Sequence, residues 1–341
     1  MAFVPTAPAS QIASVLSTTL RAVAQDSIAD NVTNGHVLYH WLNAKGHKKT
    51  LDGGQSIQCP VMLAQNTTAE SYEGYEAGDH DPQEGLTMAM YPWKQARVSI
   101  SISGIERFMN GGQWMISDQL AWKIDQATIS LQELMNYMLY RFGTANGGKD
   151  FLGLAQIVST APSANTCGMI STSNTAWQNI AVDGDTTISS WATMRHQMRN
   201  LYNQCSRGRD HPTILLGNQG AYEYYEASLA TLERYQNVDV ASGEFEGLMF
   251  KGAPFFFDQD MPLLQAIGAT SAKASEYGLY MLNHKHLWLC TAKGADFTPD
   301  DFAKPSDQDA WKAWIYVYGN IITDIRHSHG VLYNILNTIT A

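Results

Sequence analysis

The side chains best suited to bind a metal ion in this sequence are three pairs of closely spaced histidines. His36 and His40 stand four residues apart, which on a helix would place two imidazoles on one face. The Glu of a His-Glu-x-x-His motif is absent, and no third ligand is evident. Two further pairs would each lie on one side of a strand, again without a carboxylate partner: His284 with His286, and His327 with His329. Histidines satisfied at a surface or interface are therefore a better interpretation than zinc sites.

A long acidic segment lies between about residues 62 and 92 and contains no Lys or Arg. Asp79 and Asp81, followed by Gly85, resemble a calcium loop, but Met90 stands where the bidentate Glu would fall. A segment of this length with little apolar periodicity is uncommon inside a compact domain. We therefore expect a solvated, projecting loop or hairpin. Its acidic residues are Glu70, Glu73, Glu76, Asp79, Asp81 and Glu84.

Two basic clusters could bind anions or acidic side chains. One holds Lys45, Lys48 and Lys49, and the other holds Arg195, Arg199, Arg207 and Arg209 together with His196. For the arginines we expect pairing with acids of the same or a neighbouring subunit, and the alternative is contact with an anion or a nucleic acid. The formal net charge of −10 argues against a protein whose main affinity is for nucleic-acid phosphates.

The usual signatures of enzymes are absent from the sequence. Neither Gly-x-Ser-x-Gly nor Gly-x-x-x-x-Gly-Lys-Ser/Thr occurs, and no Gly-x-Gly-x-x-Gly follows an expected strand. The cysteines are too widely spaced for Cys-x-x-Cys metal sites or a dense disulfide framework, so buried reduced thiols are expected. They are Cys59, Cys167, Cys205 and Cys290. We expect neither catalytic residues nor a cofactor.

Composition favours a cytosolic protein that associates with itself. The 341 residues are 45% hydrophobic and only 16% charged, with Trp 9 and Tyr 16, so a large core can form and much aromatic surface remains to be buried. The N-terminus has no basic region followed by an apolar one, and no window approaches twenty uninterrupted apolar residues. We expect neither secretion nor a membrane span.

The most regular feature of the chain is an amphipathic helix expected over residues 117–142, which would be about 38 Å long. Ser117 can cap its start and Gly143 can end it. The expected buried face is Leu120, Ile124, Ala127, Leu131, Leu134, Met135, Met138 and Phe142. Such a helix can be the spine of an elongated subunit, and the alternative is one long helix of a bundle.

Strands are expected on both sides of this helix. Val98, Ile100 and Ile102 alternate with polar residues in the strand before it. After a polar stretch from residue 159 to 187, helices over 189–205 and 219–235 enclose a short buried strand at 212–216, which predicts a sheet with helices packed on it. Further strands are expected at 248–250, 255–258, 278–282, 286–291 and 311–325, the last alternating on both faces.

The order of these parts resembles a tailed-bacteriophage major capsid protein over nearly the whole chain. The matching parts are a lean N-terminal arm, a long extended loop, Trp93-Lys94-Gln95 entering a strand, the long helix, Gly153-Leu154-x-x-Ile157-Val158, Trp177, a two-helix second domain, and a closing strand with Arg326-His327-Ser328-His329-Gly330. The motifs are diffuse, and the specificity lies in their order.

The resemblance implies the α+β shell fold named after phage Hong Kong ninety-seven. It would comprise an arm (residues 1–55), an extended loop hairpin (56–100), a peripheral domain with the spine helix and an antiparallel sheet (101–160 and 276–341), and an axial domain with a sheet flanked by helices (161–275). Such subunits form pentamers and hexamers of an icosahedral virion shell around double-stranded DNA, assembling in the host cytoplasm. The implied partners are other copies of the chain, a scaffolding protein, a portal and a decoration protein.

Under this resemblance, the acidic loop and the two basic clusters are expected to be assembly contacts. The loop between Glu70 and Gly85 has no Lys, so the Lys–Asn crosslink of some relatives is not expected. Two alternatives remain: a nanocompartment shell of the same fold that encloses a protein cargo, and a metal-dependent enzyme that uses His36 and His40.

Overall fold

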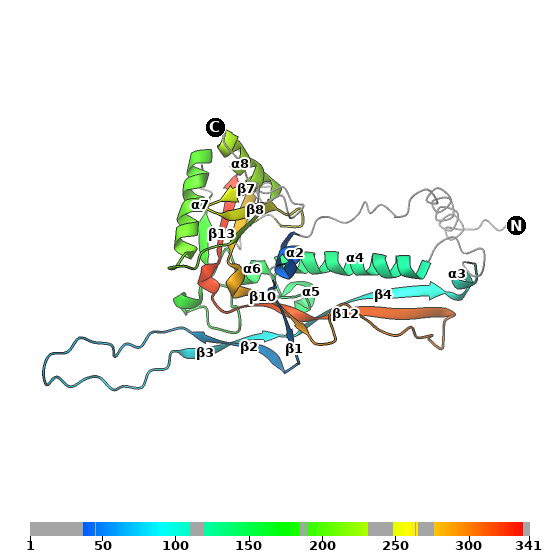
Figure 1. The fold of residues 1–341 in the computed structure, drawn as a ribbon, viewed down its shortest axis with the longest axis horizontal. Helices are drawn as coiled ribbons and strands as arrows, with labels where there is room; N and C mark the ends of the chain where they lie inside the picture. Colours follow the sequence, from blue (N-terminus) through cyan, green and yellow to red (C-terminus); the bar gives the residue numbers. More distant parts are fainter. Residues whose placement is uncertain are drawn as a thin grey trace. The chain divides into compact units, whose positions relative to one another are not determined.

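The computed structural model describes residues 37–44, 46–109, 119–184, 188, 190–230, 248–262, 264 and 276–336. Helices and strands occur largely in separate runs along the chain (Figure 1), as expected for an α+β fold. The chain forms two compact units, one from residues 1–34, 97–133 and 297–316, the other from residues 35–96, 134–296 and 317–341. Most of the predicted arm, including His36, and Lys45 lie outside the described residues.

The second unit contains a six-stranded mixed sheet. In spatial order its strands are β5 (Ile180–Asp183), β13 (Gly330–Leu336), β9 (Glu276–Leu282), β6 (Ile214–Gly217), β8 (Ala253–Phe257) and β7 (Leu248–Phe250). The β13–β5 and β6–β8 pairs are parallel, and the other pairs are antiparallel. Residues 276–336 contribute β9 and β13 to this sheet and further strands to the second large sheet, which is described below. The predicted domain boundaries stay a prediction.

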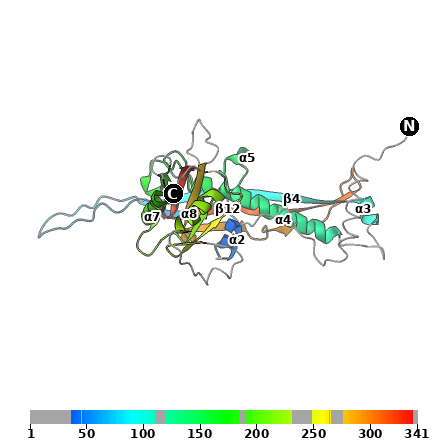
Figure 2. The same cartoon turned by 90° about the horizontal axis from the view of Figure 1, so that it is seen from above.

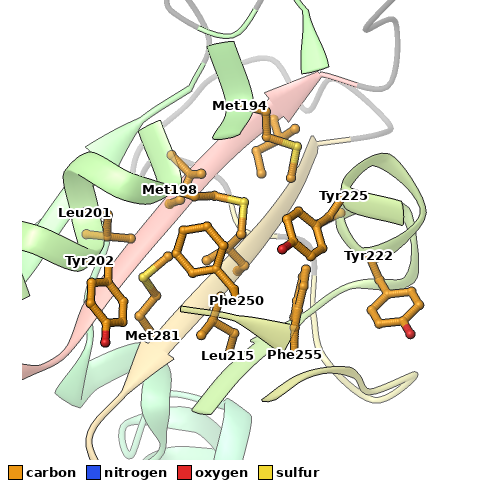
Figure 3. Close-up of a cluster of buried hydrophobic side chains, with 14 of the residues drawn as sticks. Met194, Met198, Leu201, Tyr202, Leu215, Tyr222, Tyr225, Phe250, Phe255 and Met281 are labelled. Atoms are coloured by element: carbon orange, nitrogen blue, oxygen red, sulfur yellow. The ribbon is translucent and has the colours of Figure 1, made fainter. Parts of the chain in front are cut away.

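Two helices, α7 (Trp191–Cys205) and α8 (Gln219–Ala230), lie side by side against this sheet (Figures 1 and 2). The sequence predicted both, and α7 begins at a capping box in which Ser190 accepts a hydrogen bond from the backbone N–H of Thr193. Figure 3 shows the core between helices and sheet, where Met194 and Met198 gather with aromatic rings of the strands. The buried strand β6 lies at the centre, as its apolar run predicted.

The other large sheet is built around β12 (Ala310–Thr323). In the second unit β12 is antiparallel to β10 (Leu287–Ala292), which is parallel to β1 (Lys48–Leu51). In the first unit β12 pairs with β11 (Thr298–Pro299), and it also pairs with β4 (Lys94–Ser103). The predicted alternation is confirmed in both strands: Ala313, Ile315 and Val317 of β12 and Ala96 and Ile100 of β4 are buried.

The predicted long helix is α4 (Gln119–Tyr140), and Ser117 lies outside the described residues. Leu131, Met135 and Met138 are buried as expected, but Leu134 is 40% exposed, so its place on the buried face was wrong. The buried side near the end of α4 instead includes Asn136, Leu139 and Tyr140.

The end of α4 is tied to the turn after β8 by side-chain hydrogen bonds. The Tyr140 hydroxyl donates to Asp258 Oδ2 over 2.8 Å, and Asn136 Nδ2 donates to Asp260 Oδ2 over 2.8 Å. Burial raises the pKa of Asp258, because desolvation disfavours its charged form. This helix end is therefore fixed by polar contacts as well as by apolar packing.

The chain then turns closely around Gly153. A Cβ at this position would lie 2.2 Å from the carbonyl oxygen of Arg141 and 2.6 Å from that of Met138, so only glycine lets the next segment pass the end of α4. That segment forms α6 (Leu154–Ile157), which follows the short α5 (Ala145–Gly148). Other described helices are α2 (Val37–Ala44), α3 (Gly104–Met109) and the 3₁₀ turn η2 (Thr175–Trp177).

Arg326 holds α6 from the other side. It lies in the 3₁₀ turn η5 (Arg326–Ser328), is fully buried, and donates to the carbonyl oxygens of Ile157 over 2.6 Å, Gln156 over 3.0 Å and Asn165 over 3.2 Å. Burial lowers the pKa of the guanidinium from its usual value. Three carbonyl oxygens therefore accept hydrogen bonds from the guanidinium group. No carboxylate of the described residues forms an ion pair with it.

Candidate assembly interface

The extended loop begins and ends in a two-stranded hairpin, β2 (Ser56–Met62) and β3 (Leu86–Pro92). Because opposite residues of an antiparallel pair share a face, its register defines two faces. One face carries Ile57, Val61, Ala89 and Tyr91, which are buried in the second unit. The Tyr91 hydroxyl anchors this face by donating to the Thr323 carbonyl over 2.7 Å.

The opposite face of the hairpin is apolar but lies in water, and we call it the outer face. Its apolar members are Pro60, Met62, Leu86, Met88, Met90 and Pro92. Met62 is 73% exposed and Leu86 is 75% exposed. A contiguous apolar strip of this kind is typical of a surface that another molecule covers. The alternation Leu86-x-Met88-x-Met90 is visible in the sequence. Sequence reasoning assigned these residues to the acidic segment and did not predict an apolar strip.

The six acidic residues of the loop are all exposed, from Glu70 to Glu84. Their carboxylates accept hydrogen bonds from the loop's own backbone: Glu70 from Asp79 N–H, Glu76 from Glu73 N–H, and Asp79 from Asp81 N–H. Within the described ranges none of the six forms an ion pair with a Lys or an Arg. Tyr72 and Tyr75 are exposed in the same loop.

The two basic clusters differ in their partners. Lys48 forms an ion pair with Asp296 at 2.5 Å, and Lys49 Nζ lies 3.7 Å from the ring centroid of Trp288. Both lysines are therefore engaged within their own chain. Of the arginines, Arg195 is half-buried and the other three are exposed: Arg199, Arg207 and Arg209.

The later histidine pairs do not lie on strands, so that placement was wrong. His284 and His286 lie in the 3₁₀ turn η4 (His284–His286), because the chain turns there between β9 and β10. His284 Nδ1 lies 2.8 Å from Thr213 Oγ1, and His286 Nδ1 lies 2.9 Å from Asp324 Oδ1. Although burial favours the neutral ring, the carboxylates of Asp324 and Asp210 raise the pKa of His286.

The second pair is split by η5, which contains His327, whereas His329 follows it and is fully buried. His329 Nδ1 accepts a hydrogen bond from the Asn283 N–H over 3.2 Å, and Nε2 lies 3.3 Å from Thr323 Oγ1. Burial lowers the pKa of His329 to about 3, so the ring is neutral at pH 7. Across the described parts of the chain, no three His, Cys, Asp or Glu side chains are grouped as metal ligands.

Among the helices in the described ranges, none combines the length and apolar character that a membrane span requires. All four cysteines are free thiols, and Cys167, Cys205 and Cys290 are buried. Sequence reasoning did not identify Arg326 or the Tyr140–Asp258 contact, because each depends on a partner more than a hundred residues away.

No protein-family model matches the chain, and no curated protein matches it. Solved structures do match over nearly its whole length. The capsid asymmetric unit of cyanophage A-1(L) has a TM-score of 0.66 at 17% identity, covering 91% of this chain and 95% of the phage chain. The SrpI encapsulin of Synechococcus elongatus PCC 7942 has a TM-score of 0.59 at 9% identity, covering 94% and 96%.

The capsid of a native GTA particle is also similar, with a TM-score of 0.56 at 11% identity, covering 91% of this chain and 93% of that one. These similarities extend through both compact units and leave little of either chain unmatched. The fold implied by the sequence resemblance is confirmed: this chain has the shell fold of tailed-phage capsid and encapsulin subunits.

Proposed function

We propose that this chain is the major capsid protein of a tailed bacteriophage. It is a structural subunit without enzymatic activity that assembles through pentamers and hexamers into an icosahedral shell around double-stranded DNA. The observation that carries the proposal is the full-length match, in which more than nine-tenths of the cyanophage capsid chain and of this chain superpose.

The outer face of the β2–β3 hairpin supports the proposal. An isolated subunit would leave Met62 and Leu86 largely in water, whereas contact with a second copy would bury them. Shell subunits make many such contacts between unlike surfaces. A set of these contacts forms a closed shell when each contact rotates the next subunit by a fixed angle. Overlapping hairpins add contact area without enlarging the core of each subunit.

The finer parts of the proposal follow the resemblance. Residues 1–55 form the arm, 56–100 the extended loop, 101–160 and 276–341 the peripheral domain, and 161–275 the axial domain. A scaffolding protein, a portal and a decoration protein are the proposed partners in the virion, with assembly in the host cytoplasm. The net charge of −10 fits a shell that contains DNA without binding its phosphates strongly.

A nanocompartment shell is the second candidate, favoured by the similarity to the SrpI encapsulin. The two functions differ in content, since one shell would hold DNA and the other a protein cargo. Nuclease-protected DNA in purified particles supports the phage function, and a stoichiometric second protein without nucleic acid supports the nanocompartment.

Light scattering and negative-stain electron microscopy test the shared part of both functions. The chain is expressed alone, and infected-cell lysate is fractionated for the same chain. Closed particles in either preparation are expected. Small discrete oligomers in both would contradict shell formation.

A further inference from the structure

Four arginines on and after α7 carry positive charge that the described residues of their own chain do not pair with a carboxylate. Arg195 and Arg199 lie on α7, and Arg207 and Arg209 follow its last residue, Cys205. In the part of the chain that the structure describes, none of the four forms an ion pair with a carboxylate. The described residues therefore do not provide the expected pairing within the subunit, and acids of a neighbouring subunit are the other expected partner.

Two of the arginines, Arg195 and Arg199, lie one turn apart on α7. Met194 and Met198 turn one side of α7 into the core (Figure 3), which leaves positions 195, 199 and 203 as a separate strip, one turn apart. Lys251 extends this strip, because its Nζ lies 2.7 Å from Asn203 Oδ1. We call the strip and the following turn the arginine face.

The carboxylate nearest in sequence is already engaged. Asp210 ends the turn that contains Arg207 and Arg209, but its Oδ1 accepts from Lys285 Nζ over 2.8 Å. A helix dipole favours cations near the C-terminal end of α7, which does not account for Arg195 and Arg199 in its first two-thirds. Neither Asp210 nor the helix dipole therefore accounts for the whole arginine face, and an acidic segment of another molecule would complement it.

The acidic loop of a second copy has the chemistry that this face requires. It offers six exposed carboxylates with no cation paired to them in the described chain, together with the exposed rings of Tyr72 and Tyr75. Guanidinium groups bind carboxylates through two parallel hydrogen bonds and stack on tyrosine rings. The chain's other basic cluster is a poorer match, because Lys48 and Lys49 already contact Asp296 and Trp288.

Building on the proposed shell function, we propose that the acidic loop of one subunit docks on the arginine face of a neighbouring copy. The contact is electrostatic, so it aligns subunits and weakens as ionic strength rises. One subunit carries both halves of the contact, and each copy can therefore give one and receive one around a ring.

A double-mutant cycle tests the contact. One variant carries Arg199→Gln, Arg207→Gln and Arg209→Gln, a second replaces the loop acids from Glu70 to Glu84 by their amides, and a third combines both sets. The critical concentration for assembly is measured at low salt. Each single set should raise it about tenfold, and the combination should cost no more than the larger single effect.

A matched control changes three exposed lysines away from the face, Lys149→Gln, Lys293→Gln and Lys304→Gln, and should leave assembly within about twofold of the unmodified chain. Effects that multiply in the combined variant would overturn the proposal, as would an equal effect of the control. If the unmodified chain forms no shells, the proposed function fails, which is a different result.

Crosslinking gives a direct readout of the same contact. Glu76→Cys and Arg199→Cys variants are mixed before assembly and treated with a short bismaleimide. A crosslinked peptide joining position 76 of one variant to position 199 of the other is expected. Because a bismaleimide joins only thiols, crosslinks from position 76 to position 76 or to Cys59 without the 76–199 peptide would refute this docking site.

Discussion

Replacing Met62 and Leu86 by glutamine should impair assembly without destabilising the subunit. Both side chains lie on the outer face of the β2–β3 hairpin, where they pair across the two strands at its loop end. They are 73% and 75% exposed, so neither contributes much packing to the folded subunit. Their apolar surface becomes useful only when a second copy covers it.

The exposed fractions set the size of the effect. Full burial of a Met or Leu side chain contributes about 1.5–3 kcal/mol. Because about three-quarters of each side chain is exposed in the isolated subunit, contact with a second copy would contribute about 1–2 kcal/mol at each position. Together they contribute about 2–4 kcal/mol per subunit to assembly. At about 1.4 kcal/mol per factor of ten, the critical concentration should rise about 30-fold to 700-fold.

Light scattering against protein concentration measures this change, and urea unfolding of the unassembled subunit measures folding. Met249→Gln on β7 changes a methionine that is only 38% exposed, so it is a control for assembly alone and should leave the critical concentration little changed. Unchanged assembly by the double variant would refute the assignment of the outer face as an interface. A large loss of folding stability would show that these side chains act inside the subunit instead.

Three further changes test the fold that holds these surfaces. Arg326→Met leaves three carbonyl acceptors of residues 156, 157 and 165 without their donor, so the free energy of unfolding should fall by about 3–5 kcal/mol; a fall below about 1 kcal/mol in urea titrations would contradict the role of Arg326. Gly153→Ala places a Cβ 2.2 Å from the Arg141 carbonyl oxygen and should cost about 1–3 kcal/mol in the same titration, whereas an unchanged midpoint would show that the turn has room. His329 has a pKa lowered to about 3, so the unfolded chain, with a His pKa near 6.5, binds the extra proton between these values. The contribution of His329 to the free energy of unfolding should therefore be fully present above about pH 6.5 and fall by about 1.4 kcal/mol per pH unit below it. His329→Gln should reduce the slope of unfolding free energy against pH between about pH 6.5 and 5. Equal slopes in the two proteins would mean that His329 titrates normally.

Local periodicity was sufficient to predict the elements that carry the core. The alternation in β4 and β12 and the 3.6-residue pattern in α7 depend only on which side of an element faces the interior. The buried run of β6 and the polar start of α7 at Ser190 were likewise readable from neighbouring residues. The shell fold followed from the order of these elements.

Contacts between distant segments could not be predicted from such patterns. Leu134 has the right spacing for the buried side of α4, but the helix end buries Asn136 and Tyr140 instead, and these residues reach Asp258 and Asp260. The sequence placed Arg326 in the closing motif, but its hydrogen bonds to the carbonyls around α6 appear only in the folded chain. The turns that hold His286 and His329 depend on how β9 and β10, and β12 and β13, pass between two sheets.

The assembly residues were only partly predictable for the same reason. The acidic loop is visible as a run of charge, and its exposure follows from that charge. The outer face of the hairpin needs the register of β2 and β3, which sets Met62 opposite Leu86. The contrast between engaged lysines and unpaired arginines needs the positions of Asp296, Trp288 and Asp210.

Cryo-electron microscopy of particles purified from cells that produce this chain tests the central claim most directly. The account predicts a closed icosahedral shell in which the β2–β3 hairpin of each subunit lies against a neighbouring copy and buries Met62 and Leu86. A preparation of monomers or small oligomers, or a shell in which the outer face of the hairpin remains in solvent, would contradict it.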